Sequence, residues 1–269
     1  MAGRGAAPAV GADTAPACST RTIDGAANPA TSGWMLAAAG AIFFSAKAII
    51  VKLAYRHEVD AITLLMYRML FALPLFMLMA WWAGRGKPAL TSRDWAGVVG
   101  LGFLGYYLSS TLDFMGLQYI SASLERLILY LGPTLVLLLG WLLRGRPITR
   151  GHLVASAVSY AGALIVFGLE LRVAPTLDTA WGSLLVFFST ATYALYLFYS
   201  GEFVQRLGAL RLVGWATSFA ALCCIVQFLL SRPLSAAQVA PEVIGLSVLN
   251  ATLCTALPVL MVMMAIERI

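Results

Sequence analysis

Long apolar stretches separated by short polar gaps run through most of this chain of 269 residues. Each stretch has roughly the length that an α-helix needs to cross a hydrocarbon layer about 30 Å thick. The apolar residues do not alternate with polar ones, as they would in the strands of a membrane barrel. We therefore predict an all-α polytopic membrane protein with eight spans, at residues 34–54, 62–82, 96–115, 122–143, 153–169, 180–199, 213–230 and 243–265.

Short sequence echoes connect the two halves of the chain. Phe-Phe-Ser at 43–45 in the first stretch returns at 187–189 in the sixth, and Gly-Leu at 100–101 in the third returns at 245–246 in the eighth. Five stretches separate the copies, and an odd number means that the two halves face opposite ways. This pattern predicts an inverted repeat of five-helix units, an architecture that recurs in transporters with a solute site between the halves.

The echoes also suggest how the chain is divided. Residues 1–32 are rich in Ala, Gly, Pro, Ser and Thr without an apolar run, so we predict a disordered cytoplasmic tail. We assign residues 33–170 to the first five-helix repeat and residues 180–269 to a second, incomplete repeat with three helices. Relative to the first repeat, the second then lacks its last two helices, either because the sequence is a fragment or because the natural product is short.

Composition and charge narrow the class of protein. The chain is 61% hydrophobic and only 11% charged, with a mean hydropathy of +0.86, which is more apolar surface than one water-soluble core can hide. The net charge of +6 comes from basic residues scattered through the gaps, which argues against nucleic-acid binding. Lys and Arg gather in the tail and in every second gap, which predicts a cytoplasmic N-terminus in a bacterial-type inner membrane.

No motif indicates an enzyme. Cys18, Cys223, Cys224 and Cys254 lack the spacing of a metal or redox site, and the chain has no phosphate-binding glycine loop, zinc helix or nucleophile elbow. We therefore expect no enzymatic activity, no cofactor and no metal.

Three segments resemble a known family. Residues 117–126, 130–134 and 160–166 are similar to helices three to five of the EamA-type drug/metabolite transporter superfamily. The resemblance implies ten helices in two inverted repeats, cytoplasmic termini, and secondary transport of small metabolites or drugs, often as export. Two positions at which family members often carry Glu hold Gly132 and Arg146 here, so no role of those carboxylates carries over.

Five charged residues fall inside the predicted spans: Lys47, Arg68, Asp113, Glu125 and Arg126. A charge at mid-membrane costs several kcal/mol unless it is paired or hydrated, so each one is a functional hypothesis. In one interpretation Asp113 or Glu125 carries a proton while Lys47 or Arg68 holds a solute carboxylate. In the other, the two carboxylates form fixed structural pairs with Arg68 and Arg126.

Three further residues are candidates for the substrate or proton pathway. Pro133 can kink the fourth span and leave a carbonyl free, although a purely structural kink has the same signature. Tyr193 and Asn250 can line a cavity or can join neighbouring helices by hydrogen bonds.

The function predicted from these residues is secondary transport, as an exporter, of small metabolites or drugs such as amino acids. The expected partners are a small solute and the lipid bilayer. The alternative is a truncated or regulatory, non-transporting membrane protein that pairs with a second copy or with another chain.

Overall fold

The computed structural model describes residues 29–145, 147–167 and 176–266, and within these ranges it contains only helices and their connections. The predicted tail therefore lies outside the described residues, except that the first helix begins at Pro29. The helices are α1 (Pro29–Ser45), α2 (Lys47–Tyr55), α3 (Ala61–Gly84), α4 (Ser92–Gly102), η1 (Phe103–Leu108), α5 (Ser109–Tyr119), α6 (Ala122–Leu129), α7 (Gly132–Arg144), α8 (Arg150–Phe167), α9 (Leu177–Leu207), α10 (Ala209–Ser231), η3 (Leu234–Ala237), α11 (Pro241–Ala251), η4 (Thr252–Ala256) and α12 (Leu257–Ile266).

The described residues of all eight apolar stretches lie in these helices, apart from the breaks at residues 46 and 130–131, which confirms the predicted all-α membrane fold. Four of the eight are interrupted: α1 gives way to α2 at Ala46, α6 to α7 at residues 130–131, and η1 and η4 are π-helical turns inside otherwise α-helical segments. A π-helical turn holds an extra residue and occurs most often at functional sites. The interruptions are therefore the first structural indication of where to look for chemistry.

Several helices begin at side chains that cap them. Asp60 accepts hydrogen bonds from the backbone N–H groups of Ile62 and Thr63 at the start of α3. Thr91 and Asp94 form a reciprocal capping box at α4, and Ser121 accepts from the N–H of Leu124 at α6. These caps satisfy donors that a helix leaves unpaired at its N-terminus, and so they fix where the spans start.

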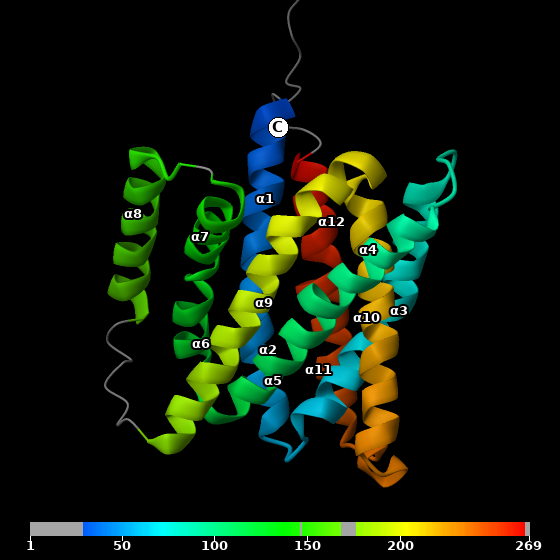
Figure 1. Cartoon of the computed structure of the whole chain (residues 1–269). Coiled ribbons are helices and arrows are strands. Elements are labelled where there is room, and N and C mark those ends of the chain that lie inside the picture. Colours follow the sequence, from blue (N-terminus) through cyan, green and yellow to red (C-terminus); the bar gives the residue numbers. More distant parts are fainter. Residues whose placement is uncertain (1–28, 146, 168–175, 267–269) are drawn as a thin grey trace, which may run out of the picture.

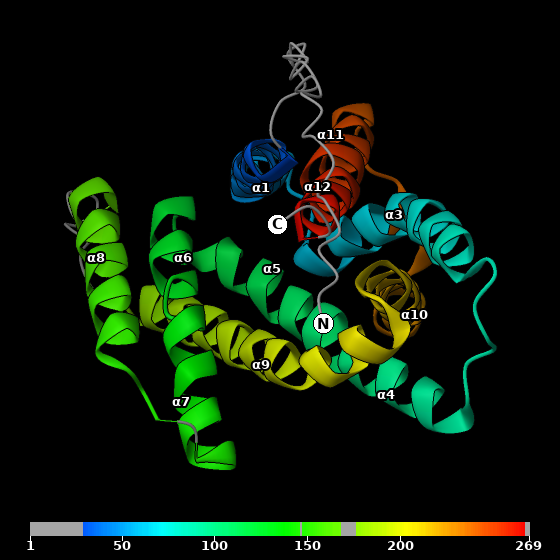
Figure 2. The same ribbon diagram turned by 90° about the horizontal axis from the view of Figure 1, so that it is seen from above.

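The helices pack in three main pairs, α3 with α10, α5 with α9, and α1 with α12. Figure 2, which looks down on the bundle, shows α3 beside α10 and α5 alongside α9. The α3–α10 pair approaches closely at Gly214, where an added Cβ would lie 2.7 Å from the Cβ of Ala80. Small residues allow helix backbones to approach in this way inside membranes.

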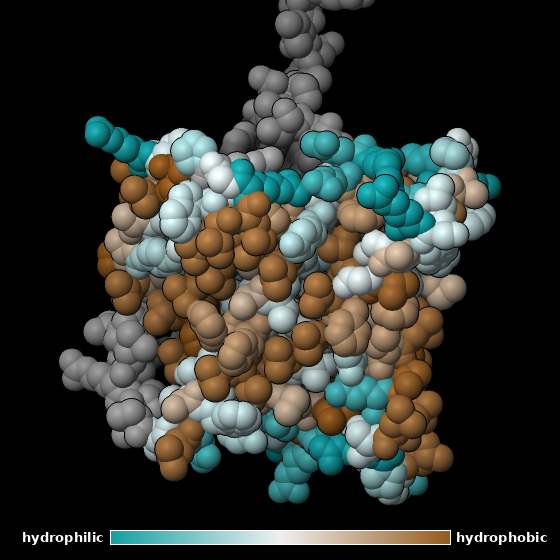
Figure 3. All heavy atoms as spheres, in the orientation of Figure 1, coloured by the Kyte–Doolittle hydropathy of each residue, from teal (hydrophilic) through white to brown (hydrophobic). Residues whose placement is uncertain are grey.

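The surface of the bundle suits a bilayer. Figure 3 shows a hydrophobic band across the middle of the molecule, with hydrophilic residues gathered at its upper and lower edges. Among the described residues, six helical segments are long and apolar enough to cross a membrane: Ala38–Tyr55, Ala61–Gly84, Ala122–Arg144, Leu177–Leu207, Ala209–Ser231 and Pro241–Met261. Large apolar side chains such as Leu230 and Ile165 point outward from this band, as expected where lipid replaces water.

Candidate functional site

Four of the five predicted intramembrane charges meet in one buried cluster. The ammonium of Lys47 lies 2.5 Å from Asp113 Oδ2, to which it donates a hydrogen bond, and 3.4 Å from Glu125 Oε1. Glu125 Oε2 in turn lies 3.1 Å from Arg126 Nε. Glu125 is fully buried, and Lys47 and Asp113 are 6% and 3% exposed. Lys47 is therefore shared between two buried carboxylates, one of which also has an arginine beside it.

The interrupted helices bring these side chains together. Lys47 is the first residue of α2, directly after the break at Ala46. Asp113 lies in α5, one turn beyond the π-helical η1. Glu125 lies in the first turn of α6, where a negative charge is favoured by the helix dipole, and it precedes the break before α7. Each member of the cluster is thus close to a point where a membrane helix departs from regular α geometry.

The cluster leaves hydrogen-bonding capacity unused. Asp113 Oδ1 and both carboxylate oxygens of Glu125 are buried without a hydrogen-bond partner among the described residues. The contacts of Glu125 with Lys47 and Arg126 have ion-pair distances without the geometry of a hydrogen bond. Because buried polar atoms are nearly always satisfied, such exceptions call for a ligand, a water or a proton.

Arg68 lies apart from these pairs. It is 6% exposed, and its Nε donates a hydrogen bond of 3.1 Å to Thr255 Oγ1 in η4. Its guanidinium sits 5.1 Å from the ring centre of Phe114, the neighbour of Asp113 in α5. No carboxylate of the described residues forms an ion pair with it. The structural pair of Arg68 with Asp113 is therefore not formed, and Asp113 Oδ2 pairs with Lys47 instead.

Phe44 completes the cluster on the side of α1. Its ring centre lies 5.7 Å from the ammonium of Lys47 and 5.8 Å from the guanidinium carbon of Arg126. Its carbonyl oxygen also accepts a long hydrogen bond, 3.5 Å, from Arg126. Two cations thus approach one ring, an arrangement that aromatic rings favour through their negative faces.

The remaining predicted site residues lie elsewhere in the bundle. Pro133 stands at the start of α7, directly after the break, and Tyr193 stacks on Tyr196 in α9 with ring centres 5.5 Å apart. Asn250 is 2% exposed, and its backbone carbonyl accepts a hydrogen bond from the hydroxyl of Thr255. The same hydroxyl accepts the hydrogen bond from Arg68. None of the described contacts joins the side chain of Pro133, Tyr193 or Asn250 to the charged cluster.

Sequence reasoning missed Thr255 and Phe44. Thr255 lies inside an apolar run, and only the π-helical turn η4 rotates its hydroxyl into position between Asn250 and Arg68. Phe44 belongs to the repeated Phe-Phe-Ser triplet, but its approach to the two cations depends on the break between α1 and α2. The Phe-Phe-Ser echo was the one signal that could have singled out Phe44.

Comparisons with known proteins agree with a multi-helix membrane transporter. The chain is 27% identical over 253 residues to the uncharacterized transporter YcbK of Bacillus subtilis (strain 168), covering 89% of this chain and 78% of the relative. A crystal structure of a protein that is 18% identical shares the fold with a TM-score of 0.59, over 87% of this chain and 79% of the other. The EamA-like transporter family matches residues 31–168, just over half of the 269 residues, and the chain therefore belongs to this family of multi-pass membrane transporters.

Proposed function

We propose that this protein is a proton-coupled secondary transporter of small carboxylate-bearing solutes, such as amino acids, across the inner membrane. The observation that carries the proposal is a difference between two buried cations. Lys47 contacts two buried carboxylates, while Arg68, equally buried, has no carboxylate partner among the described residues. Counting the five charges together, the site holds three cations and two anions, which leaves one positive charge for an anionic ligand.

Arg68 is the proposed contact for the solute. An uncompensated buried charge in a protein costs several kcal/mol, so it is retained where a ligand or a switch uses it. The guanidinium can bind a carboxylate through two parallel hydrogen bonds, and its planar fork is held by Thr255 on one side and by the ring of Phe114 on the other. A solute carboxylate bound there would neutralise the excess charge of the site.

Asp113 and Glu125 are the proposed proton carriers. With both ionised, Lys47 is held between them; a proton on either carboxylate removes one of its two partners. Lys47 is attached to α2, Asp113 to α5 and Glu125 to α6, so the protonation state determines how tightly these three helices are held together. A gradient of protons can drive a conformational change only through such a difference between states.

We further propose that the two inverted repeats rock against each other around this site. In the two halves the counterparts are α1 and α9, α3 and α10, and α5 and α12. Replacing each helix by its counterpart turns the α1–α12 pair into the α5–α9 pair and leaves the α3–α10 pair unchanged. These are the three main helix pairs. Corresponding segments also run in opposite directions in Figure 1: α1 descends while α9 rises, and α3 rises while α10 descends. Both the third and the eighth span contain a π-helical turn, η1 and η4. The resemblance to drug/metabolite transporters favours export, and the loop charges favour a cytoplasmic N-terminus.

The test is flux in reconstituted liposomes. Purified protein is offered a panel of radiolabelled amino acids with and without an imposed pH gradient, and we expect gradient-dependent flux above that of empty liposomes. Asp113→Asn should abolish the dependence on the pH gradient, while Asp178→Asn, the same change at an exposed position in the first turn of α9, should leave it intact.

Circular dichroism and insertion into the liposomes should be unchanged in both variants. Gradient-dependent flux by Asp113→Asn would reject its role as a proton carrier. Absence of flux by the unaltered protein, with every solute tested, would favour the alternative of a non-transporting protein that needs a partner chain.

A further inference from the structure

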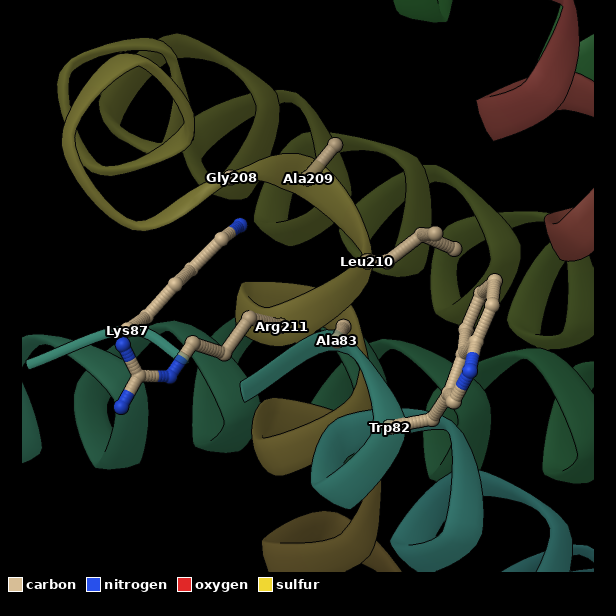
Figure 4. A pocket seen from close by; sticks show the side chains of 7 residues that line it. All are labelled: Trp82, Ala83, Lys87, Gly208, Ala209, Leu210 and Arg211. Atoms are coloured by element: carbon tan, nitrogen blue, oxygen red, sulfur yellow. The ribbon is translucent and has the colours of Figure 1, made fainter. Parts of the chain in front are cut away.

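A pocket on the upper edge of the bundle is separate from the charged cluster. It lies between the end of α3 and the start of α10, has a volume of about 220 Å³, and is lined by Trp82, Ala83, Lys87, Gly208, Ala209, Leu210 and Arg211. Figure 4 shows the ammonium of Lys87 directed toward Gly208 at the beginning of α10, with the guanidinium of Arg211 below it. Two cationic residues therefore contribute to the lining of one small pocket.

The pocket has more cationic donors than the described residues satisfy. Arg211 is 8% exposed, and one of its terminal nitrogens donates a 2.9 Å hydrogen bond to the carbonyl of Pro88, but its Nε is buried without a partner. No carboxylate of the described residues forms an ion pair with Arg211 or Lys87. Asp94, the acidic residue of the neighbouring α4, is already engaged by Arg206 and by its capping box.

The start of α10 adds further donors. Gly208 precedes this 23-residue helix with a φ of +86° and, having no side chain, offers no cap. The first three residues of α10, Ala209, Leu210 and Arg211, all line the pocket, and their N–H groups have no acceptor within the helix. No acidic residue occupies the first turn to complement the positive end of the helix dipole.

Together these features make a receptor for an oxyanion. An ammonium, a guanidinium and an uncapped helix N-terminus are the groups that bind phosphate in proteins. Trp82, which is 61% exposed at the end of α3, and Leu210 give the same pocket an apolar wall at the depth where tryptophans meet lipid headgroups. We propose that this pocket binds a phosphate group, the chemistry shared by the headgroup of an anionic phospholipid and by free phosphate.

Occupancy by such a ligand would link the loop that follows α3 to α10 through Lys87 and Arg211. This inference does not depend on the proposed transport mechanism, because the pocket and the charged cluster share no residue. A binding measurement therefore tests it even if no transported solute is found.

The experiment uses the full chain in maltoside micelles, which contain no phosphate. The melting temperature is followed while three probes are titrated: short-chain phosphatidylglycerol, a short-chain glucosyl diacylglycerol without phosphate, and inorganic phosphate. Chloride at equal ionic strength is the control for inorganic phosphate. We expect phosphatidylglycerol to raise the melting temperature and the glucosyl lipid to leave it unchanged. A rise with inorganic phosphate as well would identify the bare oxyanion as a sufficient ligand.

Two variants connect the effect to the pocket. Lys87→Gln changes an exposed side chain and should fold normally, and loss of one charge-assisted hydrogen bond should weaken binding about tenfold or more. Arg85→Gln is the matched control, because Arg85 lies over the ring of Trp81 outside the pocket and should bind as the unaltered protein does. Arg211→Gln should weaken binding further if it folds. No rise with either phosphate-bearing probe, or a rise that Lys87→Gln leaves unchanged, would overturn the proposal.

Discussion

Replacement of Lys47 by Met tests whether the charged cluster is held together by its shared lysine. Met preserves much of the volume and flexibility of the side chain and removes only the charge. Asp113 and Glu125 would then remain buried beside each other, with Arg126 as the one described cation paired to either of them.

The expected loss of stability follows from the distances. At an effective dielectric constant of about 20, unit charges at the 2.5 Å separation of Lys47 from Asp113 attract by roughly 7 kcal/mol, and at the 3.4 Å separation from Glu125 by roughly 5 kcal/mol. Burying the ammonium opposes this by several kcal/mol, and removal of one partner of a buried ion pair usually costs about 3–5 kcal/mol. We expect Lys47→Met to lose about 3–5 kcal/mol of unfolding free energy.

The assay is reversible unfolding of the purified protein in mixed micelles with increasing dodecyl sulfate, followed by circular dichroism. Lys52→Met on the same helix is the control, because Lys52 is half-buried and forms no ion pair among the described residues. In the double variant with Asp113→Asn, most of the loss should be recovered, since one uncompensated charge is gone. A double-mutant cycle should therefore give a coupling of about 1.5 kcal/mol or more.

The reasoning would be refuted by either of two results. If Lys47→Met loses no more stability than Lys52→Met, the buried charge is compensated by groups other than Asp113 and Glu125. If the cycle gives a coupling below about 0.5 kcal/mol, the hydrogen bond between Lys47 and Asp113 does not contribute to stability.

Three further predictions follow from the contacts. Asp60→Ala should cost about 1–2 kcal/mol of unfolding free energy because it uncaps α3, whereas Arg232→Ala, which removes the half-exposed partner of Asp60, should cost under about 1 kcal/mol in the same assay. Gly214→Ala should destabilise the protein at the α3–α10 contact. Gly245→Ala, where an added Cβ meets nothing within 4 Å, should raise the free energy of unfolding by about 0.5–1 kcal/mol. Equal effects at the two sites would contradict the close approach of α3 and α10. Arg68→Gln should raise the KM of flux about tenfold with little change in maximal rate, and a loss of rate alone would argue against solute binding.

The sequence predicted the spans well because each depends on local hydrophobicity. The described residues of all eight stretches coincide with helical segments. This includes the third stretch, where Ser109 and Asp113 lower the hydropathy. Residues 168 and 169, at the end of the fifth stretch, lie outside the described ranges. The sequence also singled out Lys47, Asp113 and Glu125, since a charge in hydrocarbon needs a partner, and the structure brings these three side chains together. The inverted repeat and the roles of the individual residues stay predictions.

Which partner each charge takes could not be read from the sequence. Asp113 pairs with Lys47 rather than with Arg68 because the break at Ala46 and the π-helical η1 determine how α2 and α5 are rotated about their own axes. The break at Ala46 has no proline or glycine beside it, and Gly102 and Gly105 at η1 do not announce a π-helical turn because glycine is frequent in membrane helices. The contact of Arg68 with Thr255 depends in the same way on η4.

The π-helical turn η1 sets the rotational phase of everything that follows it in the third span. Its extra residue shifts α5 by one position relative to a continuous α-helix, and one position corresponds to about 100° around the helix axis. Regular α geometry in Phe103–Leu108 with the number of residues unchanged would turn the carboxylate of Asp113 away from Lys47 by more than a quarter of a revolution, although every charge would remain in the sequence. Deletion of one residue there would restore its direction. The geometry of η1 and the number of residues in the third span are thus as much a requirement of the buried site as the identity of its residues.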